Sequence, residues 1–136
     1  MLACIEQWIF PPMCCLCGLS SPPMQDFCTV CIELLPWATD RCFRCALPLA
    51  MGLEAIYCQH CRECPPAFNR MHALFSYEPP INRMIAKFKF SGDLAYGRIL
   101  GSLLAKKLEA DSHRYPLPQA LVPVPLHHKR WVNRGV

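Results

Sequence analysis

Eight cysteines in four Cys-x-x-Cys pairs are the residues of this sequence whose type and spacing could do chemistry. The pairs form two consecutive copies of one unit, with ten residues between the pairs of the first copy and twelve in the second. The eight are Cys14, Cys17, Cys28, Cys31, Cys42, Cys45, Cys58 and Cys61. A Cys-x-x-Cys turn places two thiolates on one side, and two such turns complete the tetrahedral shell that Zn²⁺ takes in structural sites. The spacing therefore predicts two structural zinc ions.

Two ways of sharing these pairs between metals are open from the spacing. Sequential pairing within each copy gives a double zinc ribbon, and interleaved pairing gives a cross-braced knot. The short connections suit a hairpin, so sequential pairing is favoured. The side chains left over are Cys4, Cys15, Cys64, His60 and His72. Cys64 stands three residues after Cys61 and could replace Cys58, whereas for the histidines a surface or otherwise satisfied role is favoured over a ligand role.

The composition divides the chain into a cysteine-containing part and a cysteine-free part, and it argues against a secreted or a membrane-spanning protein. The 136 residues include 11 cysteines, all between positions 4 and 64, and 14 prolines. An odd cysteine count and a start without a basic export signal favour a reducing, cytoplasmic location over a disulfide framework. No apolar run approaches the length of a bilayer span. The formal net charge of +4 lies entirely in residues 113–136.

The cysteine-free part predicts a portion of an α/β domain. After Pro65-Pro66, residues 73–77 are predicted as a strand, and a helix begins at Pro79-Pro80. Its predicted apolar face is Ile81, Met84, Ile85 and Phe88. Asp93 is the expected N-cap of a second helix. That helix carries the stripe Ile99, Leu100, Leu103, Leu104 and Leu108. Residues 120–124 are predicted as a buried strand, and the order of elements indicates part of a parallel sheet.

Six stretches together resemble the competence-associated ComF family. They are Phe10 to Cys14, Cys28 to Cys31, Leu34 to Trp37, Phe75 to Pro80, Lys87 to Asp93 and Val122 to Arg130. The resemblance implies an N-terminal double zinc ribbon joined to a type I phosphoribosyltransferase-like domain. The expected fold class is α+β, small and metal-bound. The expected organisation is a lead over 1–13, the double ribbon over 14–64, and the incomplete start of the α/β transferase-like domain over 71–136.

One departure from the family pattern concerns the transferase signature, a strand ending in paired Asp followed by a Thr/Gly-rich phosphate loop. This sequence has no Asp-Asp pair, and its only threonines are Thr29 and Thr39. Such loops hold phosphate through backbone N–H groups and hydroxyls. We therefore expect the chain to be the first part of a family member, ended by truncation or frameshift, and to be inactive as a transferase on its own.

The resemblance also implies partners. It places a pyrophosphate or a nucleic-acid backbone near the basic residues Lys87, Lys89, Lys129, Arg130 and Arg134. The expected role is support of DNA uptake and natural transformation, with single-stranded DNA and other uptake proteins as partners. Two alternatives remain: a phosphoribosyl-transfer enzyme of nucleotide metabolism, acting through a longer parent protein that binds phosphoribosyl pyrophosphate, and a zinc-ribbon module that binds nucleic acid or protein.

Overall fold

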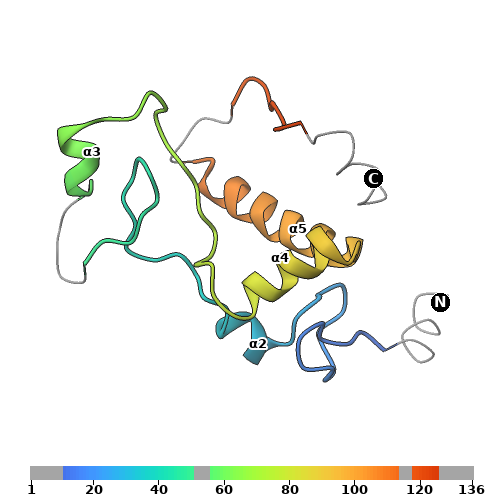
Figure 1. Ribbon diagram of the computed structural model, residues 1–136. Helices are drawn as coiled ribbons and strands as arrows, with labels where there is room; N and C mark the ends of the chain where they lie inside the picture. Colours follow the sequence, from blue (N-terminus) through green and yellow to red (C-terminus); the bar gives the residue numbers. More distant parts are fainter. Residues whose placement is uncertain (1–10, 51–55, 114–117, 126–136) are drawn as a thin grey trace. The chain divides into compact units, whose positions relative to one another are not determined.

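The computed structural model describes residues 11–50, 56–113 and 118–125 (Figure 1). Its helices are α2 (Thr29–Glu33), α3 (Gln59–Glu63), α4 (Ile81–Phe90) and α5 (Leu94–Asp111). The chain divides into two compact units. Residues 1–35 and 79–136 form unit 1, and residues 36–78 form unit 2. Each unit holds one copy of the duplicated cysteine motif. The predicted boundaries at 14–64 and 71–136 follow the motifs instead, and they stay a prediction.

Helix α4 forms as its apolar spacing predicts. Pro80, whose ring fixes a helical φ, directly precedes it, and the Pro80 carbonyl accepts from the Met84 amide at 3.1 Å. Ile81 and Met84 are each only 2% exposed, so the predicted face is the buried one. The helix ends where Gly92 takes a φ of +68°, a conformation that costs glycine little. The Lys87 carbonyl there accepts from the amides on either side of Gly92.

Helix α5 follows at once and packs against α4 (Figure 1). The predicted N-cap is confirmed, because the Asp93 carboxylate accepts from the Ala95 amide at 3.2 Å. Ile99, the first residue of the predicted stripe, is buried. A Cβ placed on Gly97 would lie 2.6 Å from the Phe88 ring, so glycine at this position lets α4 and α5 approach closely. The two helices therefore provide the core of unit 1, together with Phe27 and Leu35.

The two predicted strands do not form as expected. Residues 73–77 contain only an isolated bridge, in which Phe75 pairs with Trp37 of the same unit and the two rings lie 4.8 Å apart. Residues 120–124 take no regular structure, and the buried strand expected there is wrong. Leu121, Val122 and Val124 are almost fully exposed. A strand needs a hydrogen-bonded neighbour, and none of the described residues pairs with this segment. The phosphoribosyltransferase-like fold thus stays a prediction.

Among the described residues, no helix is both long enough and apolar enough to cross a bilayer.

Candidate metal centres

The first cysteine pair, Cys14 and Cys17, lies on a tight turn that is held by backbone hydrogen bonds. The Cys14 amide donates to the Leu19 carbonyl at 2.7 Å, and the Gly18 amide donates to the Cys14 carbonyl at 2.9 Å. Gly18 takes a φ of +72°, which turns the chain directly after the second cysteine. A bridge between Met13 and Ser20 joins the arms of the turn. The sequence therefore presents the sulfurs of this pair from one rigid loop.

The second pair of the first copy begins a short helix. Cys28 is the N-cap of α2, and its sulfur accepts from the Cys31 amide at 3.4 Å. The helical turn then directs the Cys31 sulfur to the same side as the Cys28 sulfur. Cys17 and Cys28 come from different pairs, yet their sulfurs lie only 3.7 Å apart. The turn and the helix thus bring the two pairs of this copy together.

The second copy repeats this backbone pattern. The Cys42 amide donates to Leu47 at 2.8 Å, and the Ala46 amide donates to the Cys42 carbonyl at 2.9 Å. Cys58 is the N-cap of α3, and its amide donates to the Cys42 sulfur at 3.3 Å. The sulfurs of Cys45 and Cys58 lie 3.7 Å apart, as in the first copy. The duplication that the spacing predicts is therefore also a duplication of structure.

The geometry of both sulfur groups fits zinc. The structure forms one group from Cys14, Cys17, Cys28 and Cys31 and another from Cys42, Cys45, Cys58 and Cys61, with all four sulfurs of each group within 4.8 Å of one another. Four thiolates at about 2.3 Å from a tetrahedral zinc are about 3.8 Å from each other. The sulfur–sulfur distances of 3.7 Å between Cys17 and Cys28 and between Cys45 and Cys58 match that value. The grouping is the sequential one, and the two Cys4 groups fit two structural zinc ions.

Without metal, one cysteine of each group has a lowered pKa and ionises more readily than its neighbours. Burial opposes ionisation of Cys14, yet hydrogen bonds from the backbone of Cys17, Cys28 and Leu16 lower its pKa to about 6. The same balance lowers the pKa of Cys42 to about 6. Burial and neighbouring thiols raise the pKa of Cys61 to about 12. Zinc must therefore displace protons from the remaining thiols of each group, so binding is coupled to proton release.

The cysteines left over from the pairs lie outside both groups. Cys15 is half-buried, and burial together with the charges of Cys14 and Asp26 raises its pKa to about 11, which keeps it a neutral thiol. Cys64 is exposed at the C-cap of α3, and Cys58, not Cys64, completes the second group. His60 and His72 are exposed and in neither group. Cys4 lies outside the described residues.

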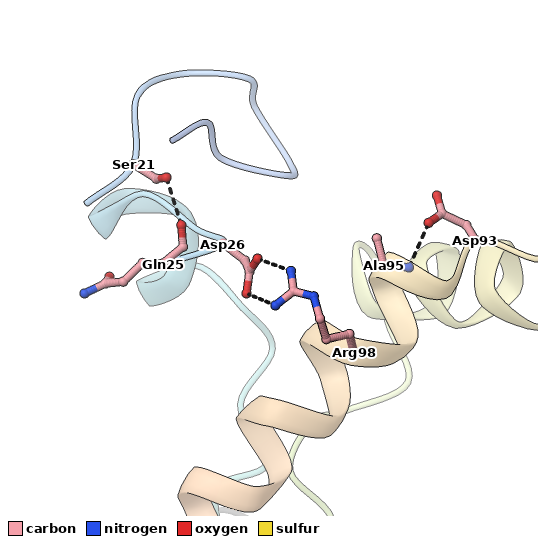
Figure 2. A network of polar contacts seen from close by, with 6 residues as sticks. All are labelled: Ser21, Gln25, Asp26, Asp93, Ala95 and Arg98. Atoms are coloured by element: carbon pink, nitrogen blue, oxygen red, sulfur yellow. Dashed lines mark hydrogen bonds and ion pairs between the residues drawn. The ribbon is translucent and has the colours of Figure 1, made fainter. Parts of the chain in front are cut away.

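An ion pair links the first group to α5, and residues of both line a common cavity. Arg98 donates to both carboxylate oxygens of Asp26, at 2.5 and 3.4 Å (Figure 2). The Asp26 carbonyl accepts from the Cys15 amide at 2.8 Å, inside the metal turn. The next residue, Phe27, is 3% exposed. A small cavity of about 80 Å³ lies here, lined by both Phe27 and Ile99. Metal turn and helix are therefore connected directly within unit 1.

In unit 2, aromatic and arginine side chains contact one another close in sequence to the ligands of the second group. The rings of Phe43 and Tyr57 meet edge to face, with centroids 6.0 Å apart. The Arg44 guanidinium lies 5.5 Å from the centre of the Tyr57 ring, and the Arg70 guanidinium lies 4.3 Å from that of Phe43. We call these four side chains the Arg–aromatic cluster. Sequence reasoning missed it because its members come from three separate segments with no common spacing.

The structure tests few of the predicted basic residues. Lys87 and Lys89 are exposed in the last turn of α4, and the Lys87 ammonium lies 5.5 Å from the centre of the Tyr96 ring. Lys129, Arg130 and Arg134 lie outside the described residues. A phosphate or nucleic-acid role for these five residues stays a prediction.

Comparison with known proteins agrees with the metal geometry. Residues 5–64 match the model of the Double zinc ribbon domain. The chain is 28% identical to DNA utilization protein YhgH of Salmonella typhi over 128 residues, covering 92% of the chain and 56% of that protein. It is 36% identical to Competence protein F of Haemophilus influenzae over 84 residues, covering 58% of the chain and 37% of that protein. The Escherichia coli K12 YhgH protein is 28% identical over 92% of the chain.

These relatives are longer than the matched region, and the chain spans about half the length of YhgH. No solved structure matches the chain. The predicted resemblance to ComF proteins is confirmed: the chain carries a double zinc ribbon and is similar over most of its length to Competence protein F and DNA utilization protein YhgH.

Proposed function

We propose that this chain is the zinc-binding part of a protein that handles DNA taken up from outside the cell. The observation that carries the proposal is the similarity to a DNA utilization protein over 92% of the chain, including both Cys4 groups. Competence protein F of Haemophilus influenzae, matched over 58% of the chain, supports the same role. The zinc ions are structural, because all four positions around each metal are filled by protein sulfur and none is left for a substrate.

The role of the metal is to hold two small modules that bury little apolar surface. Among the described residues of unit 2, only Cys42, Ala46 and Cys61 are buried. A core of this size does not stabilise a fold alone, and metal ligation is the usual substitute. Loss of zinc should therefore abolish function by unfolding the modules and not by removing a reactive centre.

The test is genetic and uses the complete gene that encodes this chain. Deletion in the source organism should lower the number of transformants per microgram of DNA or, in a strain that does not transform, growth with DNA as the nutrient. The intact gene should restore the phenotype, and the Cys14→Ser/Cys42→Ser variant should not. Unchanged transformation and unchanged growth on DNA after deletion would remove the proposed role.

A finer proposal concerns residues 71–136, which we assign to the opening of a phosphoribosyltransferase-like domain. It is supported by α4 and α5, which occur where the apolar spacing of this part of the chain predicts helices. The sequence contains no Asp-Asp pair to begin a phosphate loop. The purified chain should therefore release no pyrophosphate from phosphoribosyl pyrophosphate above a protein-free control. Release that depends on Lys87 would contradict this expectation.

A further inference from the structure

The two zinc centres differ in how well solvent reaches one of their sulfur ligands. In the first centre Cys17 is exposed, and the contact between its sulfur and that of Cys28 lies at the surface. The equivalent ligands of the second centre, Cys45 and Cys58, are both half-buried, and so is the contact between their sulfurs. Both sulfur–sulfur distances are 3.7 Å, so the centres differ in what covers the ligands and not in how the ligands are arranged.

The residue after the second cysteine of each copy is one cause of this difference. Gly18 and Ala46 occupy this place, and both have a positive φ. Ala46 is buried, at 9% exposure. Gly18 is exposed, and a Cβ added to it would meet nothing within 4 Å. The first turn is therefore open to solvent at the residue next to Cys17, whereas the same place in the second turn is filled.

A pair of side chains in the second copy is another cause. Arg44 precedes Cys45 in the chain and Tyr57 precedes Cys58, and the Arg44 guanidinium lies 5.5 Å from the centre of the Tyr57 ring. This cation–π contact holds together the two segments that present these ligands. In the first copy the residue equivalent to Tyr57 is Phe27, which is buried and lines the cavity beside α5. We attribute part of the lower exposure of Cys45 to the contact between arginine and tyrosine.

We propose that Cys17 is an oxidation site, at which a peroxide reacts with the first zinc centre and releases its metal. A zinc-bound cysteine is a thiolate, and peroxides oxidise the thiolates that solvent reaches. The second centre should resist the same reagent, because none of its four sulfurs belongs to an exposed residue. The reaction depends only on the two Cys4 groups and is independent of the proposed role in DNA handling.

The reaction balances with a peroxide as the only oxidant. The Cys17 sulfur bonds to one peroxide oxygen while the O–O bond breaks, which gives a sulfenic acid and one hydroxide. The Cys28 thiolate, 3.7 Å away, then attacks the Cys17 sulfur and displaces a second hydroxide, which leaves a disulfide. Two thiolates have lost two electrons, and the peroxide has gained them. The zinc ion is left with Cys14 and Cys31 in place of the four ligands that a structural site needs.

Zinc release from the fully loaded chain tests the proposal. The probe is hydrogen peroxide, and 4-(2-pyridylazo)resorcinol measures the zinc that appears in solution. We expect one of the two zinc ions to be released at least about fivefold faster than the other, because oxidation follows the exposure of the thiolate. Dithiothreitol and added zinc should then restore two ions per chain, since a disulfide can be reduced. Release of both ions at one rate, or of neither, would overturn the proposal.

Mass spectrometry locates the oxidised sulfur. A protease that cuts before aspartate separates Cys17 from Cys28, because Asp26 lies between them. We expect a disulfide that links the two resulting peptides once the first zinc has left. Dimedone, which traps sulfenic acids, should label Cys17 when it is present during the reaction. A disulfide confined to the peptide of Cys17, or labelling of Cys45 before Cys17, would overturn the assignment.

Exchanging the flanking residues tests why the centres differ. Arg44→Leu/Ala46→Gly gives the second copy the residues on either side of Cys17. With two zinc ions bound, this variant should lose its second zinc at least about fivefold faster than the wild type. Arg62→Leu, on the exposed surface of α3, is the control and should change that rate less than about twofold. A double variant that releases zinc no faster than the wild type or the control would contradict the shielding.

Two further controls concern thiols outside both groups. Cys15→Ser and Cys64→Ser should each keep two zinc ions and the wild-type rate of release. Slower release of the first zinc in either variant would show that its sulfur, and not Cys17, starts the reaction. If Arg44→Leu/Ala46→Gly binds fewer than two zinc ions, Ala46→Gly alone serves for the comparison, because glycine adopts a positive φ without strain. The gene deletion involves no peroxide, so the oxidation site and the proposed function can fail separately.

Discussion

The two ribbons are copies in their metal turns and differ in what surrounds them. Both begin with an amide-to-carbonyl hydrogen bond that closes the first turn, at 2.7 Å from Cys14 and 2.8 Å from Cys42. Both place their third cysteine at the N-cap of a five-residue helix. Beyond the ligands, the first ribbon joins α4 and α5 in unit 1, and the second is the body of unit 2. Zinc coordination thus requires the same turn in both copies, whereas the residues outside the turns are not constrained by the metal and can take different roles.

The largest expected effect is an unequal response to loss of each metal. Cys14→Ser should release one zinc and much of the helical signal, because its group shares a compact unit with α4 and α5. Cys42→Ser should release one zinc and keep most of that signal, because its group lies in the other unit. Far-UV circular dichroism with zinc analysis measures both. Equal loss of helix in the two variants would break the distinction between the ribbons.

The contact between α4 and α5 gives the next effect. Gly97→Ala places a methyl 2.6 Å from the Phe88 ring, and we expect it to destabilise unit 1 by about 1–3 kcal/mol. Gly101→Ala is the matched control on the same helix, because nothing lies within 4 Å of its added Cβ. That change should stabilise the helix by up to about 1 kcal/mol. Urea unfolding followed by circular dichroism compares them, and similar midpoints would contradict the close approach.

A smaller effect distinguishes the two metal turns. Gly18 and Ala46 occupy equivalent positions, with φ of +72° and +57°. Gly18→Ala should weaken the first turn by about 1 kcal/mol, because a Cβ is disfavoured at positive φ. The second turn already carries that cost in Ala46. In competition with a chelator, the zinc affinity of the first group should then be about fivefold lower in the variant than in the wild type. This factor follows from about 1 kcal/mol. An unchanged release curve would show that the turn is not strained.

The smallest effect is that of the ion pair between Asp26 and Arg98. Although Arg98 donates to both carboxylate oxygens, its side chain is 62% exposed. Exposed pairs contribute about 0.2–1 kcal/mol. A double-mutant cycle with Asp26→Asn and Arg98→Gln should give a coupling in that range that falls as salt is raised. A coupling above about 2 kcal/mol would show that the pair, and not Phe27, fixes the ribbon to α5.

Sequence reasoning succeeded where the physical determinant is local. Cys-x-x-Cys spacing sets the position of two sulfurs within one turn, so the two groups could be predicted without a fold. The apolar period of α4 and the Asp93 cap of α5 are equally local. The prediction of a strand at 120–124 was wrong, because the pairing of a strand depends on a neighbouring strand elsewhere in the chain. Asp26 and Arg98 are 72 residues apart, and the Arg–aromatic cluster joins three segments, so neither leaves a periodic signal.

The central claim is that each copy of the cysteine motif holds its own zinc ion. Elemental analysis of the purified chain and of two ligand variants tests it directly. The wild type should contain two zinc ions per chain, and Cys17→Ser and Cys45→Ser should contain one each, because each removes a sulfur from a different group. Cys64→Ser should keep two, since that sulfur lies outside both groups. One zinc in the wild-type chain, or two in Cys45→Ser, would contradict the account.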